Sequence, residues 1–367
     1  MTGPAVGHAD AGRLAKRRRM RYSIFYSVLK GRGLPPRLPS MTESAVTAPA
    51  APFACARFIK EIGRGPNGAR ALSHEDTHAL YSAMLDGRVS DLELGAVLLA
   101  YRLKGETAAE LAAMLAAAQA SFEPVHIAAG AYRPVSIPSY NGARKQPNLV
   151  PLLALLLARE GVPTLVHGVT TDPGRVTSAE IFARLGIAPA TSHAGIEANL
   201  SERRLAFAPI EALAPKLARL LALRRIMGVR NSTHTLVKIL QPFAPAGLRL
   251  VNYTHPEYRE SLATLFLGHP DAAAGGALLA RGTEGEAVAD TRRQVQIDWL
   301  HDGHTQTLVD AERSSPETEP VALPESRDAA ATATWIESVL AGDTPVPPTL
   351  TRQIESIVEI VRITQTA

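Results

Sequence analysis

The stretch from Ile137 to Gly168 limits the possible folds more than any other part of the sequence. It reads IPSYNGARKQPNLVPLLALLLAREGVPTLVHG, which predicts the end of a strand, a polar turn, an apolar helix and a second strand. Strands that alternate with helices in this way lie parallel in one sheet. The apolar run from Leu149 to Ala158 is about half the ~20 residues that a membrane span needs, so it indicates a core helix and no membrane anchor.

The first third of the chain predicts helices instead of strands. Ser73 is a candidate N-cap, and capping boxes begin two further segments, Ser90 with Glu93 and Thr107 with Glu110, while a third box, Thr177 with Glu180, lies later in the chain. Later predicted strands are 135–138, 164–167, 204–208, 248–252, 277–281 and 294–300, and later predicted helices are 177–185, 212–227, 232–243, 328–340 and 350–364.

These segments predict an α/β protein in which a small helical domain accompanies a larger α/β domain with a mainly parallel central sheet. We expect residues 53–123 and 209–243 in the helical domain, and 124–208 and 244–367 in the α/β domain. Residues 1–52 form a basic, Pro- and Ala-rich extension that we expect to be disordered. This extension is either a basic nucleic-acid arm or sequence translated upstream of a start at Met41.

Composition supports a folded protein with a large core, because 46% of the 367 residues are hydrophobic and 20% are charged. The net charge of +4 comes from the extension, whose first forty residues hold nine basic side chains and one acidic side chain. The rest holds 30 basic and 34 acidic residues. The single cysteine, Cys55, excludes an internal disulfide and fits a reducing cytoplasm. We expect no cofactor and no metal site.

Basic residues nevertheless cluster in the longest stretch without an acidic residue, from Ala212 to Pro256. Its cations are Lys216, Arg219, Arg224, Arg225, Arg230, Lys238 and Arg249. Affinity for a polyanion follows local charge more closely than net charge, so this stretch is a candidate nucleic-acid-binding segment. The alternative is a solvated helix face whose arginines pair with acids elsewhere.

The turn after the first predicted strand is a candidate anion site, because amides at a helix N-terminus favour phosphate. Asn141 and Gly142 lie in this turn, and Arg144 and Lys145 follow with a longer side-chain reach. His167 and Arg175 lie near the end of the next strand, where ligands bind in parallel sheets. His167 is either a general base or, more ordinarily, a histidine held by backbone hydrogen bonds.

Two other groups of residues have an ordinary interpretation beside a functional one. Tyr132, Tyr140 and Tyr253 are candidates for base stacking, but such residues more often pack in a core. Glu284 and Glu286 are candidate magnesium ligands, but two glutamates in a turn are usually just solvated.

Several motifs together resemble the anthranilate phosphoribosyltransferase-like fold, which class III nucleoside phosphorylases share, and within it a branch of DNA-binding proteins. The motifs are KEIGRGPNGAR, DLELGAVLLAYRLKGE, IPSYNGARKQPNLVPLLALLL, VHGVTTDPGRV, RRIMGVRNSTHTLVK and RGTEGEAVA. The resemblance implies a homodimer joined through the helical domain. It also implies binding of single- and double-stranded nucleic acid without sequence preference.

The chain departs from the enzymes of this family at the residues that hold pyrophosphate. Their Gly-Thr-Gly-Gly-Asp loop matches Ser139 to Ala143 here, and the lysine of their Lys-His-Gly motif matches Val166. The acidic pair that binds magnesium in them is replaced near Glu286, Ala287 and Val288. Without these groups, a departing pyrophosphate loses its electrostatic stabilisation.

We therefore predict a nucleic-acid-binding homodimer rather than an enzyme, with no catalytic residue. The candidate binding residues are Arg144, Lys145, Arg224, Arg225, Arg230 and Lys238, with Arg64 and Arg70 contributing from the helical domain. Asn141, Gly142, His167 and Arg175 are candidates for an anion crevice. The alternative is a phosphoribosyltransferase that acts on an aromatic or nitrogenous acceptor.

Overall fold

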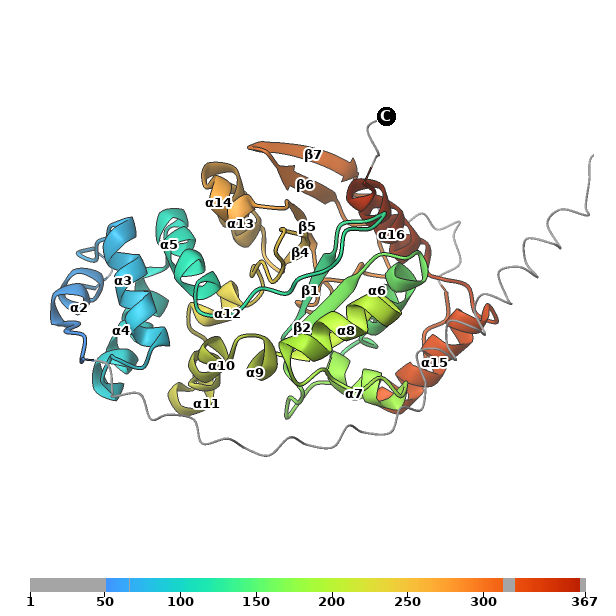
Figure 1. Ribbon diagram of the computed structural model, residues 1–367, viewed down its shortest axis with the longest axis horizontal. Helices are drawn as coiled ribbons and strands as arrows, with labels where there is room; N and C mark the ends of the chain where they lie inside the picture. The colour runs from blue at the N-terminus through green and yellow to red at the C-terminus, as the bar shows by residue number, and fades with distance from the viewer. Residues whose placement is uncertain (1–50, 66, 313–320, 364–367) are drawn as a thin grey trace, which may run out of the picture.

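The computed structural model describes residues 51–65, 67–312 and 321–363 (Figure 1). Almost all of the predicted extension, residues 1–52, lies outside the described residues. Within them, none of the helices is both long enough and apolar enough to cross a membrane.

A seven-stranded sheet forms the centre of the larger domain, with strand order β3-β2-β1-β4-β5-β6-β7. The strands are β1 (Val135–Ser139), β2 (Thr164–Gly168), β3 (Leu205–Pro209), β4 (Leu248–Tyr253), β5 (Ala277–Arg281), β6 (Ile297–His301) and β7 (His304–Val309). The first five are parallel, and β6 and β7 are antiparallel. The predicted α/β class with a mainly parallel sheet is confirmed.

Helices cover both faces of the sheet through two separate hydrophobic clusters. One face packs against α6 (Val150–Arg159), α7 (Ser178–Arg184), α15 (Ala329–Ala341) and α16 (Pro348–Val361). The other packs against α8 (His193–Arg203), α9 (Ile210–Leu213), α13 (Pro256–Gly268) and α14 (Pro270–Ala273).

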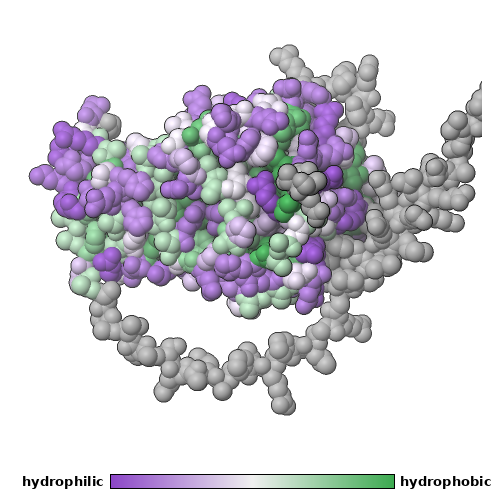
Figure 2. Space-filling model, turned by 45° about the horizontal axis from the view of Figure 1, so that its top comes forward, coloured by the Kyte–Doolittle hydropathy of each residue, from purple (hydrophilic) through white to green (hydrophobic). Residues whose placement is uncertain are grey.

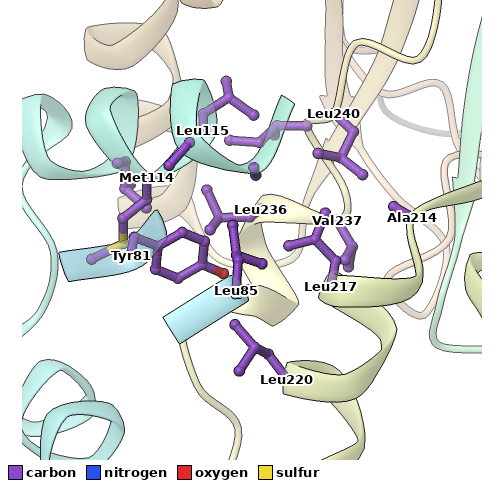
Figure 3. Close-up of a cluster of buried hydrophobic side chains, with 14 of the residues drawn as sticks. Tyr81, Leu85, Met114, Leu115, Ala214, Leu217, Leu220, Leu236, Val237 and Leu240 are labelled. Atoms are coloured by element: carbon purple, nitrogen blue, oxygen red, sulfur yellow. The ribbon is translucent and has the colours of Figure 1, made fainter. Parts of the chain in front are cut away.

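The helical part lies at one end of the sheet (Figure 1). It contains α2 (Ala56–Ile62), α3 (His74–Leu85), α4 (Asp91–Lys104), α5 (Ala108–Gln119), α10 (Pro215–Ala222), α11 (Arg224–Met227) and α12 (Thr233–Leu236). Helices from distant parts of the sequence share one core here, where Leu217 of α10 and Leu236 of α12 approach Tyr81 and Met114 (Figure 3). The buried Tyr81 hydroxyl and Thr233 Oγ1 form a hydrogen bond of 2.9 Å across this core.

β1 lies at the point where the strand order reverses. It pairs with β2 along its whole length, but with β4 only at Val135 with Leu248 and at Ser136 with Arg249. The carboxyl ends of β1 and β4 are therefore not paired with each other. Ligands of open parallel sheets bind at such a switch point.

Two predicted helices are interrupted in the structure. The segment 212–227 divides into α9, α10 and α11. The first break lies at Ala214, whose backbone is not helical (φ −146°, ψ 75°) and which precedes Pro215 at the start of α10, and the second lies at Leu223. The segment 232–243 holds only the short α12. Strand β7 and helices α8, α13 and α14 were not predicted.

The capping boxes are confirmed at Thr107 and at Thr177, where each hydroxyl and the following glutamate exchange hydrogen bonds with backbone amides. At Ser90 only half of the box forms. The Ser90 hydroxyl accepts from the amide of Glu93, but the Glu93 carboxylate accepts from the amide of Cys55 instead of that of Ser90.

The two complete boxes predict different losses of stability when their glutamates are removed. Glu110 is fully buried and accepts from Lys104 Nζ at 2.7 Å and from the amide of Leu72 at 3.0 Å. Replacing Glu110 with alanine leaves the largely buried Lys104 unpaired and is expected to cost about 3–5 kcal/mol of unfolding free energy. Glu180→Ala removes the more exposed box at Thr177, and we expect it to cost about 1 kcal/mol of unfolding free energy. Denaturant unfolding measures both, and equal losses would contradict the role of burial.

Candidate functional site

Two segments meet at the switch point of the sheet. One is the loop from Tyr140 to Leu149 between β1 and α6, and the other is the turn from Gly282 to Val288 after β5. Strand β4 lies between β1 and β5, so the two segments approach each other beyond the end of β4.

Two carboxylates from the turn bind the backbone amides of the loop. Glu286 Oε1 accepts from the amides of Asn141 and Gly142, both at 2.7 Å. Glu284 accepts from three further loop amides, those of residues 144, 145 and 146, at 3.1, 2.7 and 2.8 Å. The intervening amide of Ala143 donates to the carbonyl of Val176 at 3.0 Å. Every backbone amide from residue 141 to residue 146 therefore donates to an acceptor within the protein.

The shape of the turn places these two carboxylates. Thr283 and Glu286 exchange backbone hydrogen bonds, and the two central residues have positive φ angles of 53° at Glu284 and 88° at Gly285. This is the geometry of a type I′ turn, which favours glycine at its second central position. A Cβ atom at Gly285 would lie 1.8 Å from Asn141 Nδ2, so glycine is also needed for the close approach of the loop.

The expectation that Glu284 and Glu286 are merely solvated is wrong. Glu286 is 1% exposed, and burial raises the pKa of its carboxyl group against the opposing effect of Lys238 and the two amides. The backbone amides of this loop are not free to bind a phosphate, because these carboxylates already occupy them. The same hydrogen bonds make the pair a poor fit for magnesium, and the described residues contain no cluster of three potential ligands.

Cationic side chains surround the loop and the turn. Arg230 donates to Asn141 Oδ1 at 3.1 Å, Arg175 donates to the carbonyl of Gly142 at 3.2 Å, and Lys238 Nζ donates to the carbonyl of Gly285 at 3.0 Å. The structure thus brings together three predicted cations with Asn141 and Gly142.

The electrostatics of these side chains indicate one connected group, which we call the basic cluster: Arg102, Arg175, Arg224, Arg230 and Lys238. Burial, followed by repulsion from other members of the cluster, lowers the pKa of Arg230. Burial lowers the pKa of Lys238 to about 8, although the nearby Glu286 opposes this shift. Burial and repulsion from Arg230 also lower the pKa of the neighbouring His234 to about 4.

The cations of the basic cluster form no salt bridge within the described residues. Within the described ranges, no carboxylate lies within 4.0 Å of its cationic nitrogens, and the same holds for the exposed Arg144, Lys145 and Arg225. The sequence interpretation missed Arg102, which is exposed on α4 and joins the cluster through the fold alone.

Three other cations of the acid-poor stretch have structural roles. Lys216 pairs with Asp86 at 2.7 Å, and the guanidinium of Arg219 donates to carbonyls at the end of α3. Arg249 is 1% exposed and donates to the carbonyls of Ile239, Ala272 and Ala274, and its burial lowers its pKa to about 9. Arg249 therefore ties β4 to the segment after α12 and to the end of α14 instead of facing a ligand.

Two further candidates lie in the connection between α2 and α3. Arg64 pairs with Glu61 at 2.7 Å, whereas Arg70 is exposed. Helix α2 lies at the outer end of the helical part, away from β1 and β2 (Figure 1), where hydrophilic residues gather in Figure 2. The described contacts do not join Arg64 or Arg70 to the basic cluster.

His167 is buried within β2 and is held by side chains. Its Nδ1 lies 2.7 Å from the Tyr140 hydroxyl and its Nε2 lies 3.0 Å from Ser136 Oγ. Burial lowers the pKa of His167 to about 3, so the ring is neutral near pH 7. Tyr132, Tyr140 and Tyr253 are each partly buried against one of the two hydrophobic clusters.

Comparison with known proteins identifies the class of this fold. A family model described as glycosyl transferase family, helical bundle domain, matches residues 56–122. Anthranilate phosphoribosyltransferase from Thermus thermophilus is 22% identical with a TM-score of 0.61, covering 81% of this chain and 85% of the other. The enzyme from Saccharomyces cerevisiae with PRPP and Mg is 13% identical with a TM-score of 0.60, covering 83% and 93%. The chain has the fold of anthranilate phosphoribosyltransferases.

Sequence similarity identifies the family within this fold. The uncharacterized protein YbiB of Escherichia coli is 45% identical over 300 residues, which cover 81% of this chain and 91% of YbiB. Anthranilate phosphoribosyltransferase 2 of Ralstonia nicotianae is 30% identical, over 61% of this chain and 63% of that enzyme. The chain belongs to the YbiB family.

Proposed function

We propose that this protein binds nucleic acid without sequence preference through the basic cluster and the neighbouring Arg144, Lys145 and Arg225. The observation that carries this proposal is the absence of a carboxylate within 4.0 Å of these cationic nitrogens in the described ranges. Cations that form no salt bridge with a carboxylate are available to neutralise the phosphates of a nucleic acid and to release its counterions.

The chemistry of these side chains favours backbone contacts over base recognition. Guanidinium and ammonium groups bind phosphates of any sequence, whereas base reading requires an element that enters a groove. Arg224 and Arg225 lie on α11, which has only four residues, and Arg144 and Lys145 lie in a loop. Both single- and double-stranded DNA, and RNA, present the required phosphates. This binding would take place in the cytoplasm, in agreement with the lone, buried Cys55.

We further propose that the protein is a homodimer joined through its helical part. Three leucines repeat on one side of α4 at a helical spacing, namely Leu92, Leu99 and Leu103, and they are 86%, 45% and 78% exposed. Ile226 of α11 is 83% exposed. A second copy of the chain would cover these apolar side chains, and it would place two basic clusters on one molecule.

Replacing two exposed cations, Arg224 of the basic cluster and the neighbouring Arg225, tests the proposed binding. The double variant Arg224→Ala and Arg225→Ala is expected to weaken binding roughly tenfold at moderate salt, equally for unrelated oligonucleotides. It should also reduce the slope of log affinity against log salt by about 2, because two phosphate contacts are lost.

The double variant Lys216→Ala and Arg57→Ala provides the matched control for this experiment. It removes the same charge from cations that pair with Asp86 and Asp76. Fluorescence anisotropy titrations over a salt series measure both variants. Equal losses of affinity in the two variants would contradict the basic cluster as the binding surface, and a strong preference for one sequence would contradict sequence-independent binding.

The alternative function, a phosphoribosyltransferase, is supported by the fold of the enzymes that the chain resembles. It predicts consumption of phosphoribosyl pyrophosphate with magnesium and an aromatic or nitrogenous acceptor. We expect no consumption, because the loop amides that would face pyrophosphate bind Glu284 and Glu286. Turnover of about 1 per second or faster, an ordinary enzymatic rate, would support the alternative instead.

The proposed dimer is tested by charging the leucine face of α4. Leu99→Asp combined with Leu103→Asp is expected to shift the protein from dimer to monomer at micromolar concentration, because burying these carboxylates is costly. Analytical ultracentrifugation measures the shift. A monomeric wild-type protein, or a double variant that remains fully dimeric, would contradict this interface.

A further inference from the structure

The loop after β1 has the hydrogen-bonding pattern of an anion site whose ligand belongs to the protein. Five of its amides converge on two carboxylates, and the N–H···O distances lie between 2.7 and 3.1 Å. Short bonds of this kind between amides and an ionised oxygen are stronger than those between neutral groups. Successive amides that point at one anion form the concave sites that bind phosphate in other proteins.

The two carboxylates differ in how firmly the fold holds them. Glu286 is 1% exposed and lies deep between the loop and Lys238. Glu284 is partly exposed at the tip of the turn, and its contacts to loop amides come from its side chain alone. Removal of the Glu284 side chain would therefore expose three amides at the surface and leave the inner Glu286 contacts in place.

The surroundings of Glu284 favour an anion in its place. Arg144 and Lys145, whose amides bind Glu284, carry exposed side chains, and Arg175 donates to the Glu284 carbonyl at 3.5 Å. None of these cations has a carboxylate within 4.0 Å in the described part of the chain. A phosphate group at the position of the Glu284 carboxylate would meet the same three amides and these cations.

We propose that Glu284 acts as an internal anion that closes this loop to phosphate groups, and that it prevents free pyrophosphate from binding there. The amides of residues 144 to 146 form the phosphate-binding part of the closed site. This inference does not depend on nucleic-acid binding, which uses the exposed side chains and leaves the amides bound to Glu284.

The experiment compares pyrophosphate binding by the wild-type protein and three variants. Glu284→Ala removes the carboxylate and its volume, whereas Glu284→Gln removes the charge and keeps the volume. Glu260→Ala is the matched control, since it removes the same charge from the exposed surface of α13. Isothermal titration calorimetry with inorganic pyrophosphate, without magnesium, measures affinity, and Tm reports whether each variant is folded.

We expect Glu284→Ala to bind pyrophosphate roughly tenfold or more tightly than both the wild type and Glu260→Ala, with Glu284→Gln between them. Folded Glu284 variants that bind no better than Glu260→Ala would overturn the proposal. If Glu284→Ala does not fold, the pyrophosphate affinity of Glu284→Gln is compared with that of Glu260→Ala instead, and equal affinities would overturn the proposal.

A second measurement on the unmodified protein keeps the proposal testable even if neither variant folds. Backbone amide resonances of residues 144 to 146 are expected to stay unchanged when millimolar pyrophosphate is added to the wild-type protein. Saturable shifts at these amides would show that Glu284 does not close the loop, and the proposal would be wrong.

Discussion

The contact between two carboxylates and five backbone amides organises the whole switch point of the sheet. It joins the loop after β1 to the turn after β5 across the end of β4. The cations then take their positions from this joint, because Arg230 binds Asn141, Arg175 binds Gly142 and Lys238 binds Gly285. Without the joint, backbone amides at the end of the sheet would lack acceptors, which is costly where they are buried.

The same contact explains how a basic surface arises on a body that carries slightly more acidic than basic residues. Glu284 and Glu286 lie in the same turn that Arg175 and Lys238 contact, but their carboxylate oxygens accept from backbone amides instead of from these side chains. The cations donate to neutral carbonyl and amide oxygens, which do not cancel their charge. Their field therefore reaches the solvent, and repulsion within the cluster contributes to the lowered pKa of Arg230.

Local signals predicted those parts of the fold that local interactions determine. The capping boxes at Thr107 and Thr177 formed as expected, and five parallel strands were located to within about two residues at each end. The signals failed where a contact joins residues far apart in the chain. Glu284 lies 140 positions from Arg144, and Arg102 joins the basic cluster from α4, so no pattern of neighbouring residues could reveal either one. Charge counting likewise placed Arg249 among the candidate cations because burial is not visible in a count.

The arrangement of this loop separates two ways of binding phosphate. A small pyrophosphate substrate must be enclosed by backbone amides so that charge can be stabilised as a bond breaks, which requires that those amides be free. A polymer only needs charged side chains along its path, since many weak contacts add up over its length. Here the amides are bound to the protein's own carboxylates, whereas Arg144 and Lys145 point to solvent from the same loop. Under the proposed function, one set of hydrogen bonds thus disfavours group transfer at this site and leaves the side chains that suit a polymer available.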